Sequence, residues 1–511
     1  MAVSRDIAGA LESCSRETER TPLLADYEHD QNLQRAQISS TFRHEETEAA
    51  QVGLDQKSHL LPNNPTWRAE SWLLLSYAAP LIGTYLLQYF YSVVTIFVAG
   101  HINSEALAAA SIGVFTMNII GFSVFEGMAT ALDTLCAQAY GSGNIKGVGI
   151  HVQRMLLCMG IVAVPIAAFW ICSPWILSLF VKQTYLAVRA GQFLHVSLIG
   201  VPGYASFEAL KRFSQAQGDF TSSLVVLIIC APVNVFLNWL FVFKFGWGLE
   251  GTALASALTN DLRPILMLAY LLIFNRWTLQ CWGGFDKAAL QKWGPMISLS
   301  TAGAILNLSE WFAFEVLTFS SSYISTTHIA AQTILSTVSI LVWHIPFSVS
   351  VAVSTRIGHL VGSGALKNVR RVIPFYAAVF IVVGIFDGTV VFALRKQIAK
   401  LFSEDPAVQE IATRTIPLVA IFQLIDAILA GTSGVLRGFG RQSFAAWASF
   451  LVNYFAAVPL ALWLELGSPG LGLVGCWTAL QGGMIIVSTL EVGAIKFMSW
   501  KKCVEDAQSR D

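Results

Sequence analysis

Apolar runs alternate with short polar stretches along most of the chain, from Trp72 to about residue 500. Each run holds roughly 20 to 30 residues, which is long enough for an α-helix to cross the hydrocarbon core of a bilayer. The connections are short except for 275–293, which separates the first six runs from the last six. The pattern predicts about twelve transmembrane helices, at 73–99, 106–130, 151–173, 187–206, 221–243, 251–274, 295–321, 329–354, 372–393, 411–434, 443–465 and 471–495.

The two halves of this pattern resemble each other at an offset of about 220 residues, the kind of internal repeat from which transporter folds are built. The sequence at 107–112 is echoed at 329–334, and Gly141-Ser-Gly143 is echoed by Gly362-Ser-Gly364. An even number of helices in each repeat returns the chain to the same side of the membrane. We therefore expect an all-α membrane protein of two pseudo-symmetric six-helix lobes, with a cleft between them.

Polar segments set the expected domain boundaries. Residues 1–71 are rich in Glu, Arg, Gln, Ser and Asp and poor in aromatic residues, which is typical of a disordered cytosolic tail. The remaining segments are the N-lobe at 72–275, a cytosolic inter-lobe loop at 276–294, the C-lobe at 295–500 and a C-terminal tail at 501–511.

Basic residues concentrate in the connections that follow even-numbered helices. By the positive-inside rule both termini are then cytosolic. The residues counted are Lys146, Lys211, Arg212, Arg276, Lys287, Lys292, Lys367, Arg370, Arg371, Arg437 and Arg441.

A short motif in the tail bears on the choice of membrane. Glu19, Leu23 and Leu24 fit an acidic dileucine sorting signal of the kind read by clathrin adaptors. The alternative is ordinary tail sequence, because so short a pattern arises often by chance. We expect a multi-pass protein of the vacuolar membrane or the plasma membrane.

The composition narrows the choice of partners. Hydrophobic residues make up 55% of the chain, charged residues 13%, and the net charge is 0. These values are typical of polytopic membrane proteins, and no basic stripe indicates nucleic-acid binding. The 8 cysteines show neither zinc spacing nor a secreted disulfide pattern. We expect lipid and small organic molecules as partners, no metal, no cofactor beyond a coupling proton, and a monomer.

Acidic residues inside predicted transmembrane helices are the candidate chemistry. Glu310 and Glu315 lie in the seventh apolar run and Asp426 lies in the tenth. A charge near the bilayer centre is costly, so such acids mark ion pathways or substrate sites. Five residues of helix correspond to about 140° of rotation, so Glu310 and Glu315 cannot both face one cavity fully. Packing of the seventh helix against the tenth would bring two carboxylates together.

Proton-coupled antiport follows from such a cluster. Burial disfavours an ionised carboxyl group, so a buried cluster exchanges protons readily. A cationic substrate then competes with the proton for the same negative charge. Polar neighbours are expected either to line the site or simply to join helices by hydrogen bonds; they are Asn307, Gln332, Ser336, Thr337 and Gln423.

For other charged residues in apolar runs we expect structural roles. We expect Asp133 to pack a helix end and Arg356 to reach the interface or bind a loop. Asp261 and Arg263, beside Pro264, are expected to form a local pair or a water-lined kink.

Several separate motifs carry a family resemblance. They are Gly100-His101, 131–141, Glu310–Glu315, and Ser354–Gly358 followed by Gly362-Ser-Gly364. Together they resemble the multidrug and toxic compound extrusion (MATE) family in its eukaryotic branch, and the long tail suits a fungal member. The resemblance implies proton-coupled extrusion of cationic or amphipathic organic molecules. It also implies that Glu310 and Asp426 are the protonation and substrate sites, with Glu315 a second acid of the seventh helix.

Three other classes of membrane protein are alternatives to this family. A lipid or lipid-linked oligosaccharide flippase of the same superfamily favours a large basic cavity, whereas the buried charges of this C-lobe are acids. A major-facilitator carrier has a long central loop and basic loop motifs that the sequence lacks. A membrane enzyme with paired acids would carry protease or phosphatase motifs, which are missing, so we expect a transporter and not an enzyme.

Overall fold

The computed structural model describes residues 66–180 and 183–510, which belong to one compact unit. The sorting residues Glu19, Leu23 and Leu24 lie outside the described residues. The described chain is helical throughout, in the predicted order of membrane-length segments, so the all-α prediction is confirmed.

The N-lobe contains six membrane-length segments, two of which contain a short break in the helix. The second segment is α4, a π-helical turn and α5, and the fourth is α8, a 3₁₀ turn and α9. The helices are α3 (Trp67–Gly100), α4 (Ser104–Met117), α5 (Ser123–Ser142), α6 (Ile145–Ile171), α7 (Ser173–Phe180), α8 (Thr184–Ser197), α9 (Val201–Ala216), α10 (Thr221–Asn238) and α11 (Gly248–Ile273).

The C-lobe also has six membrane-length segments, which follow two 3₁₀ turns at Arg276–Cys281 and Lys287–Leu290. Its break lies in the fifth segment, where a π-helical turn separates α17 from α18. Residues 501–510 of the predicted tail belong to a helix, α20, whose Asp506 pairs with Arg441 at 2.8 Å. The helices are α12 (Gly294–Ser320), α13 (Thr326–Gly362), α14 (Leu366–Ala393), α15 (Arg395–Phe402), α16 (Pro406–Gly438), α17 (Gln442–Val452), α18 (Val458–Leu466), α19 (Leu473–Phe497) and α20 (Trp500–Arg510).

The membrane-length segments differ in how apolar they are. In the described chain, 9 helical segments are long and apolar enough to cross a membrane by length and composition. The α8–α9 segment, α11 and α12 fall outside that set. These three carry Lys211, Arg263 and Glu310 respectively. Segments within the apolar set bring charge into the interior as well, among them α16 with Asp426 and α19 with Glu491.

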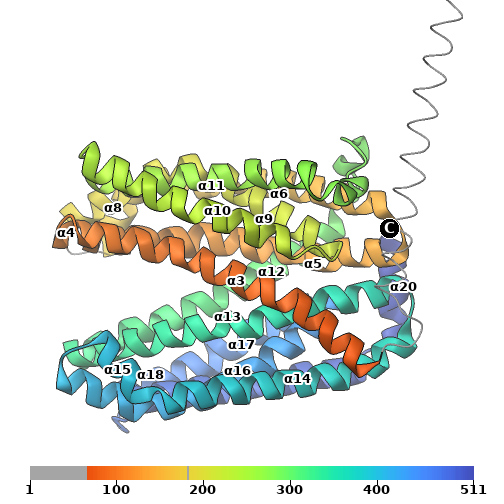
Figure 1. The fold of residues 1–511 in the computed structure, drawn as a ribbon. Coiled ribbons are helices and arrows are strands. Elements are labelled where there is room, and N and C mark those ends of the chain that lie inside the picture. Colours follow the sequence, from red (N-terminus) through yellow and green to blue (C-terminus); the bar gives the residue numbers. More distant parts are fainter. Residues whose placement is uncertain (1–65, 181–182, 511) are drawn as a thin grey trace, which may run out of the picture. The chain divides into compact units, whose positions relative to one another are not determined.

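Figure 1 shows the helices in two groups, with α3 running from the C-lobe group to the N-lobe group. Helix α3 begins at Trp67, inside the segment 1–71 expected as tail, and Thr66 caps it by accepting a hydrogen bond from the Ala69 amide. Glu70 is only 2% exposed because it pairs with Arg356 of α13. Helix α3 thus begins before the expected start of the N-lobe at residue 72, and Arg356 binds a helix instead of a loop or the interface.

The Gly-Ser-Gly repeats explain how the lobes meet at one end. A Cβ atom at Gly141 would collide with the carbonyl oxygen of His359, and one at Gly362 with that of Gln138. Gly143 and Gly364 then turn the chain with φ of 94° and 73°, in the left-handed region that favours glycine. The repeated glycines therefore let α5 and α13 approach closely, and we call this end of the lobes the closed end.

Three basic residues lie elsewhere than the loops expected to hold them. Lys211 and Arg212 are buried inside α9, and Arg437 is buried inside α16. Each has an acidic partner, described below, which the charge count along the chain does not show. The positive-inside argument therefore depends on the remaining residues, such as Lys146 and Lys367.

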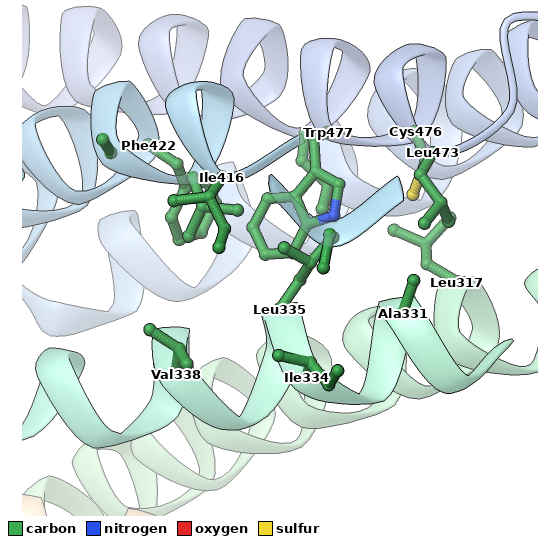
Figure 2. Packing of buried hydrophobic residues seen from close by; sticks show 14 of the residues in the cluster. Leu317, Ala331, Ile334, Leu335, Val338, Ile416, Phe422, Leu473, Cys476 and Trp477 are labelled. Atoms are coloured by element: carbon green, nitrogen blue, oxygen red, sulfur yellow. The ribbon is translucent and has the colours of Figure 1, made fainter. Parts of the chain in front are cut away.

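Aromatic and aliphatic side chains hold the C-lobe together (Figure 2). Trp477 of α19 packs edge-on against Phe422 of α16, with ring centroids 5.1 Å apart. Leu335 of α13 belongs to the same buried cluster. This core packs α13, α16 and α19 together, and Leu317 of α12, the helix that carries Glu310, joins it.

Candidate functional site

A cavity lies between the two lobes and is lined by both; we call it the central cavity. Its acidic side chains are Glu126 of the N-lobe and Glu310 and Asp426 of the C-lobe. Aromatic side chains supply much of the remaining wall, and they include Tyr85, Tyr89, Phe122, Tyr204, Trp311, Trp343 and Phe347. Acids with aromatic rings suit an organic cation, which is attracted to both.

Glu310 and Asp426 share two spaces. Both line the central cavity, and both line a smaller side cavity between α12, α13 and α16. The seventh and tenth membrane segments also meet through Phe314 and Phe422, whose ring centroids are 5.9 Å apart. The structure thus brings together the two acids that the sequence placed on different helices.

The surroundings of Asp426 leave its charge uncompensated. Its side chain is 4% exposed, and its Oδ2 atom has no hydrogen-bond partner. Glu310 and Asp387 lie close enough for their charges to act on it. Within residues 66–180 and 183–510, none of these three acids forms an ion pair. Asp387 therefore extends the acidic group onto α14.

Glu491 is a fourth acid of this region and was missed in the sequence. It lies fully buried on α19, and its carboxylate accepts hydrogen bonds from the hydroxyls of Thr432 and Ser433. Its charge interacts with that of Glu310. The signal that identified Glu310, an acid within an apolar run, applies equally to Glu491 and would have found it.

Glu315 faces away from the other acids. It is half-buried and lines neither the central cavity nor the side cavity. No hydrogen bond or ion pair joins it to another described residue. The rotation expected between Glu310 and Glu315 accounts for this difference.

Of the predicted lining residues, Asn307 lines the central cavity and Thr337 does not. Asn307 lines the central cavity and donates a hydrogen bond of 2.8 Å to the Ser123 carbonyl of the N-lobe. Thr337 donates to the Thr333 carbonyl of its own helix, at 2.7 Å. Asn307 therefore joins the lobes at the cavity wall, whereas Thr337 satisfies its hydroxyl within α13.

The other predicted lining residues join helices of the C-lobe. Gln332 accepts a hydrogen bond from Trp477 Nε1 at 3.0 Å and donates to Ser336 Oγ at 3.2 Å. Gln423 donates to Ser339 Oγ at 3.1 Å. Ser339 lines the side cavity, so Gln423 orients a wall residue without reaching the cavity itself.

Two acids of the N-lobe, Glu126 on the cavity wall and Glu208 on α9, are both engaged. Glu126 accepts a hydrogen bond of 2.5 Å from the Tyr204 hydroxyl. Glu208 pairs with Lys211 at 2.6 Å, inside one helix, and accepts a second hydrogen bond from Gln88 at 2.8 Å. These contacts fix the N-lobe charges in place.

Asp133 links the lobes near the closed end. Its carboxylate pairs with Arg212 at 3.1 Å and with Arg437 of the C-lobe at 3.7 Å. Arg437 also donates to Ser350 Oγ at 2.9 Å. The structural role expected for Asp133 is thus extended to holding the two lobes together.

The local pair expected between Asp261 and Arg263 does not form. Asp261 Oδ1 instead accepts a hydrogen bond of 3.1 Å from the Gly203 amide. The Arg263 guanidinium lies over the Tyr91 ring, with Cζ 4.1 Å from the ring centroid. Asp261 therefore contacts α9, whereas Arg263 contacts α3.

Comparison with known proteins gives the context of this architecture. The family model described as MatE matches two segments, 80–240 and 303–463. These fall in the two lobes, as expected for an internal repeat.

Two relatives match over most of their length. The fission yeast protein named uncharacterized transporter C4B3.13 is 35% identical over 464 residues, covering 90% of this chain and 85% of the relative. Protein DETOXIFICATION 17 of Arabidopsis thaliana is 30% identical and covers 87% of this chain and 92% of the relative. A solved structure, of the eukaryotic MATE transporter AtDTX14, superposes with a TM-score of 0.82 at 27% identity, covering 87% of this chain and 99% of that one.

Proposed function

The chain belongs to the MATE family of multi-pass membrane transporters, and from that premise we propose that it is a proton-coupled antiporter of small organic cations. The cargo class covers xenobiotics and secondary metabolites that are exported from the cytosol or sequestered. The names of two relatives, multidrug and toxin extrusion protein 1 of Xenopus tropicalis and DETOXIFICATION 17, support this class.

One observation carries the proposal: Glu310 and Asp426 line one cavity and form no ion pair in the described part of the chain. An uncompensated carboxylate inside a protein is costly. A proton neutralises it, and so does a cationic ligand, but both cannot do so at once. Competition between the two couples proton entry to cargo release.

The contacts between the lobes support alternating access. At the closed end Thr134 donates a hydrogen bond of 2.5 Å to the Arg437 carbonyl, and Gln138 donates one of 3.0 Å to the Gly438 carbonyl. Lys146 and Lys367 follow the two helices that meet there, so we assign this end to the cytosol. In this state the cavity faces away from the cytosol, and separation of α5 from α13 and α16 opens the opposite state.

The membrane that holds the protein is the vacuolar or the plasma membrane in this proposal. The dileucine at Leu23 and Leu24 would direct sorting through a clathrin adaptor. Fluorescence imaging of the tagged full chain distinguishes the two membranes.

Exchange in proteoliposomes tests the proposed function. An imposed pH gradient should drive uptake of a cationic dye such as tetramethylrhodamine methyl ester by the wild type, and a protonophore should abolish it. Glu310→Gln keeps the size of the side chain but cannot ionise, so we expect it to lose proton-driven exchange by about a hundredfold or more.

Glu404→Gln is the matched control, because Glu404 is an exposed acid between α15 and α16. It should exchange like the wild type. Proton-driven uptake by Glu310→Gln at the wild-type rate would remove this acid from the mechanism.

A further inference from the structure

Arg263 is a buried cation that the exchange mechanism does not use. It lies on α11, lines the central cavity and is 3% exposed. Its Nε atom has no hydrogen-bond partner. Burial of an arginine in a cavity wall is costly unless a partner compensates the charge.

The acids near Arg263 are already committed elsewhere. Asp261 accepts from the Gly203 amide, Glu126 from the Tyr204 hydroxyl, and Glu208 pairs with Lys211. Among residues 66–180 and 183–510, no acid forms an ion pair with Arg263. Since arginine keeps its proton in proteins, the N-lobe wall presents a positive charge without a protein counter-ion.

The Tyr91 ring positions this charge without neutralising it. The guanidinium lies over the ring, and the Tyr91 hydroxyl donates to the Leu227 carbonyl at 2.9 Å. The tyrosine is therefore held as a neutral platform. A guanidinium stacked on a ring keeps its N–H edge for a planar anion, and carboxylates match that edge with two parallel hydrogen bonds.

The adjoining wall is polar as well. The amides of Asn234 and Asn260 line the cavity together with Arg263. Pro264 has no amide hydrogen, so it cannot complete the helical hydrogen bond to the Asn260 carbonyl. Polar groups at an interrupted helix are a recurring feature of binding sites in transporters.

We propose that Arg263 binds a carboxylate on the transported molecule, so that the cargo is an aromatic compound carrying both a cationic group and a carboxylate. The inference rests on the proposed function, in which the cationic group binds at Glu310 and Asp426. The carboxylate then binds in the N-lobe and the ring system lies among the aromatic residues of the wall. A ligand with both charges contacts both lobes, whereas a simple cation is held by the C-lobe acids.

Two dyes that differ only in this group provide the test. Tetramethylrhodamine carries a cationic ring system and a free carboxylate, and its methyl ester lacks the anion. Fluorescence anisotropy with the purified full chain should show that the wild type binds the acid more tightly than the ester. Loss of a charge-assisted contact in Arg263→Gln should lower the acid-to-ester affinity ratio by about ten- to a hundredfold.

Two further variants separate this contact from a general loss of structure. Arg263→Lys keeps the charge but not the planar edge and should lower the ratio by a smaller factor. Arg189→Gln makes the same change at an arginine paired with Glu250 away from the cavity, and should keep the wild-type ratio. An equal ratio in wild type and Arg263→Gln, a wild-type preference for the ester, or no binding of either dye would overturn the inference.

Dye exchange under a pH gradient distinguishes this inference from the proposed function. A ratio that depends on Arg263, without proton-driven exchange of either dye, leaves the carboxylate site standing and refutes the antiporter. If the ester is exchanged under a pH gradient but the acid-to-ester affinity ratio is the same in wild type and Arg263→Gln, the antiporter stands and the carboxylate site is refuted.

Discussion

The acids of the two lobes differ in what surrounds them. In the N-lobe, Glu208 pairs with Lys211 and Asp133 pairs with Arg212. In the C-lobe, Glu310 and Asp426 share a cavity and form no ion pair in the described chain. Paired charges stabilise one arrangement of helices, while unpaired acids stay available to protons and cations. The paired acids of the N-lobe therefore have a structural role, and we assign proton exchange to the unpaired acids of the C-lobe.

The same contrast explains why the lobes are not interchangeable. An ion pair buried in protein is costly to break, because the remaining charge has no partner. In this structure Lys211 compensates the charge of Glu208 inside α9. No such partner opposes protonation of Asp426, whose neighbours Glu310 and Asp387 are also acids.

The largest expected effect on stability is in the N-lobe pair. Lys211→Met leaves Glu208 buried and unpaired, so we expect a loss of about 3–5 kcal/mol of stability, measured as thermal unfolding of the purified protein in detergent. The double variant Glu208→Gln with Lys211→Met removes both charges and should recover most of the loss.

Lys287→Met serves as the control, because Lys287 is exposed in the inter-lobe connection. Lys287→Met should unfold at the same temperature as the wild type. If Lys211→Met also unfolds at the wild-type temperature, the N-lobe acids are not structural and the contrast between the lobes fails.

The smallest expected effect is at Glu315. Because this acid lines neither cavity, Glu315→Gln should change proton-driven dye exchange by less than about twofold. A tenfold loss in the same proteoliposome assay would place Glu315 in the exchange path and enlarge the C-lobe set.

Much of this architecture follows from the sequence, and particular residues show where such reasoning stops. Runs of apolar residues predict the helices, and the Gly-Ser-Gly repeats predict equivalent positions in the two lobes. Burial of acids such as Glu310 is read from their place inside an apolar run. The same rule applied to Glu491 would have added it to the group.

Pairing across the chain is what the sequence does not reveal. Glu70 and Arg356 are 286 residues apart in sequence, yet they form one buried ion pair. Arg437 stands near the end of its apolar run, where a basic residue resembles a loop residue, but it contacts Asp133 of the other lobe. A local pattern predicts which side chains are buried but not which partner each one meets.

Proton release on ligand binding tests the central claim most directly. Tetramethylrhodamine methyl ester, added to the purified protein in weakly buffered detergent near neutral pH, should displace protons that a pH indicator detects. The double variant Glu310→Gln with Asp426→Asn should release none. Equal release by the double variant, or saturable dye binding to the wild type without proton release, would contradict exchange of protons for cargo at these two acids.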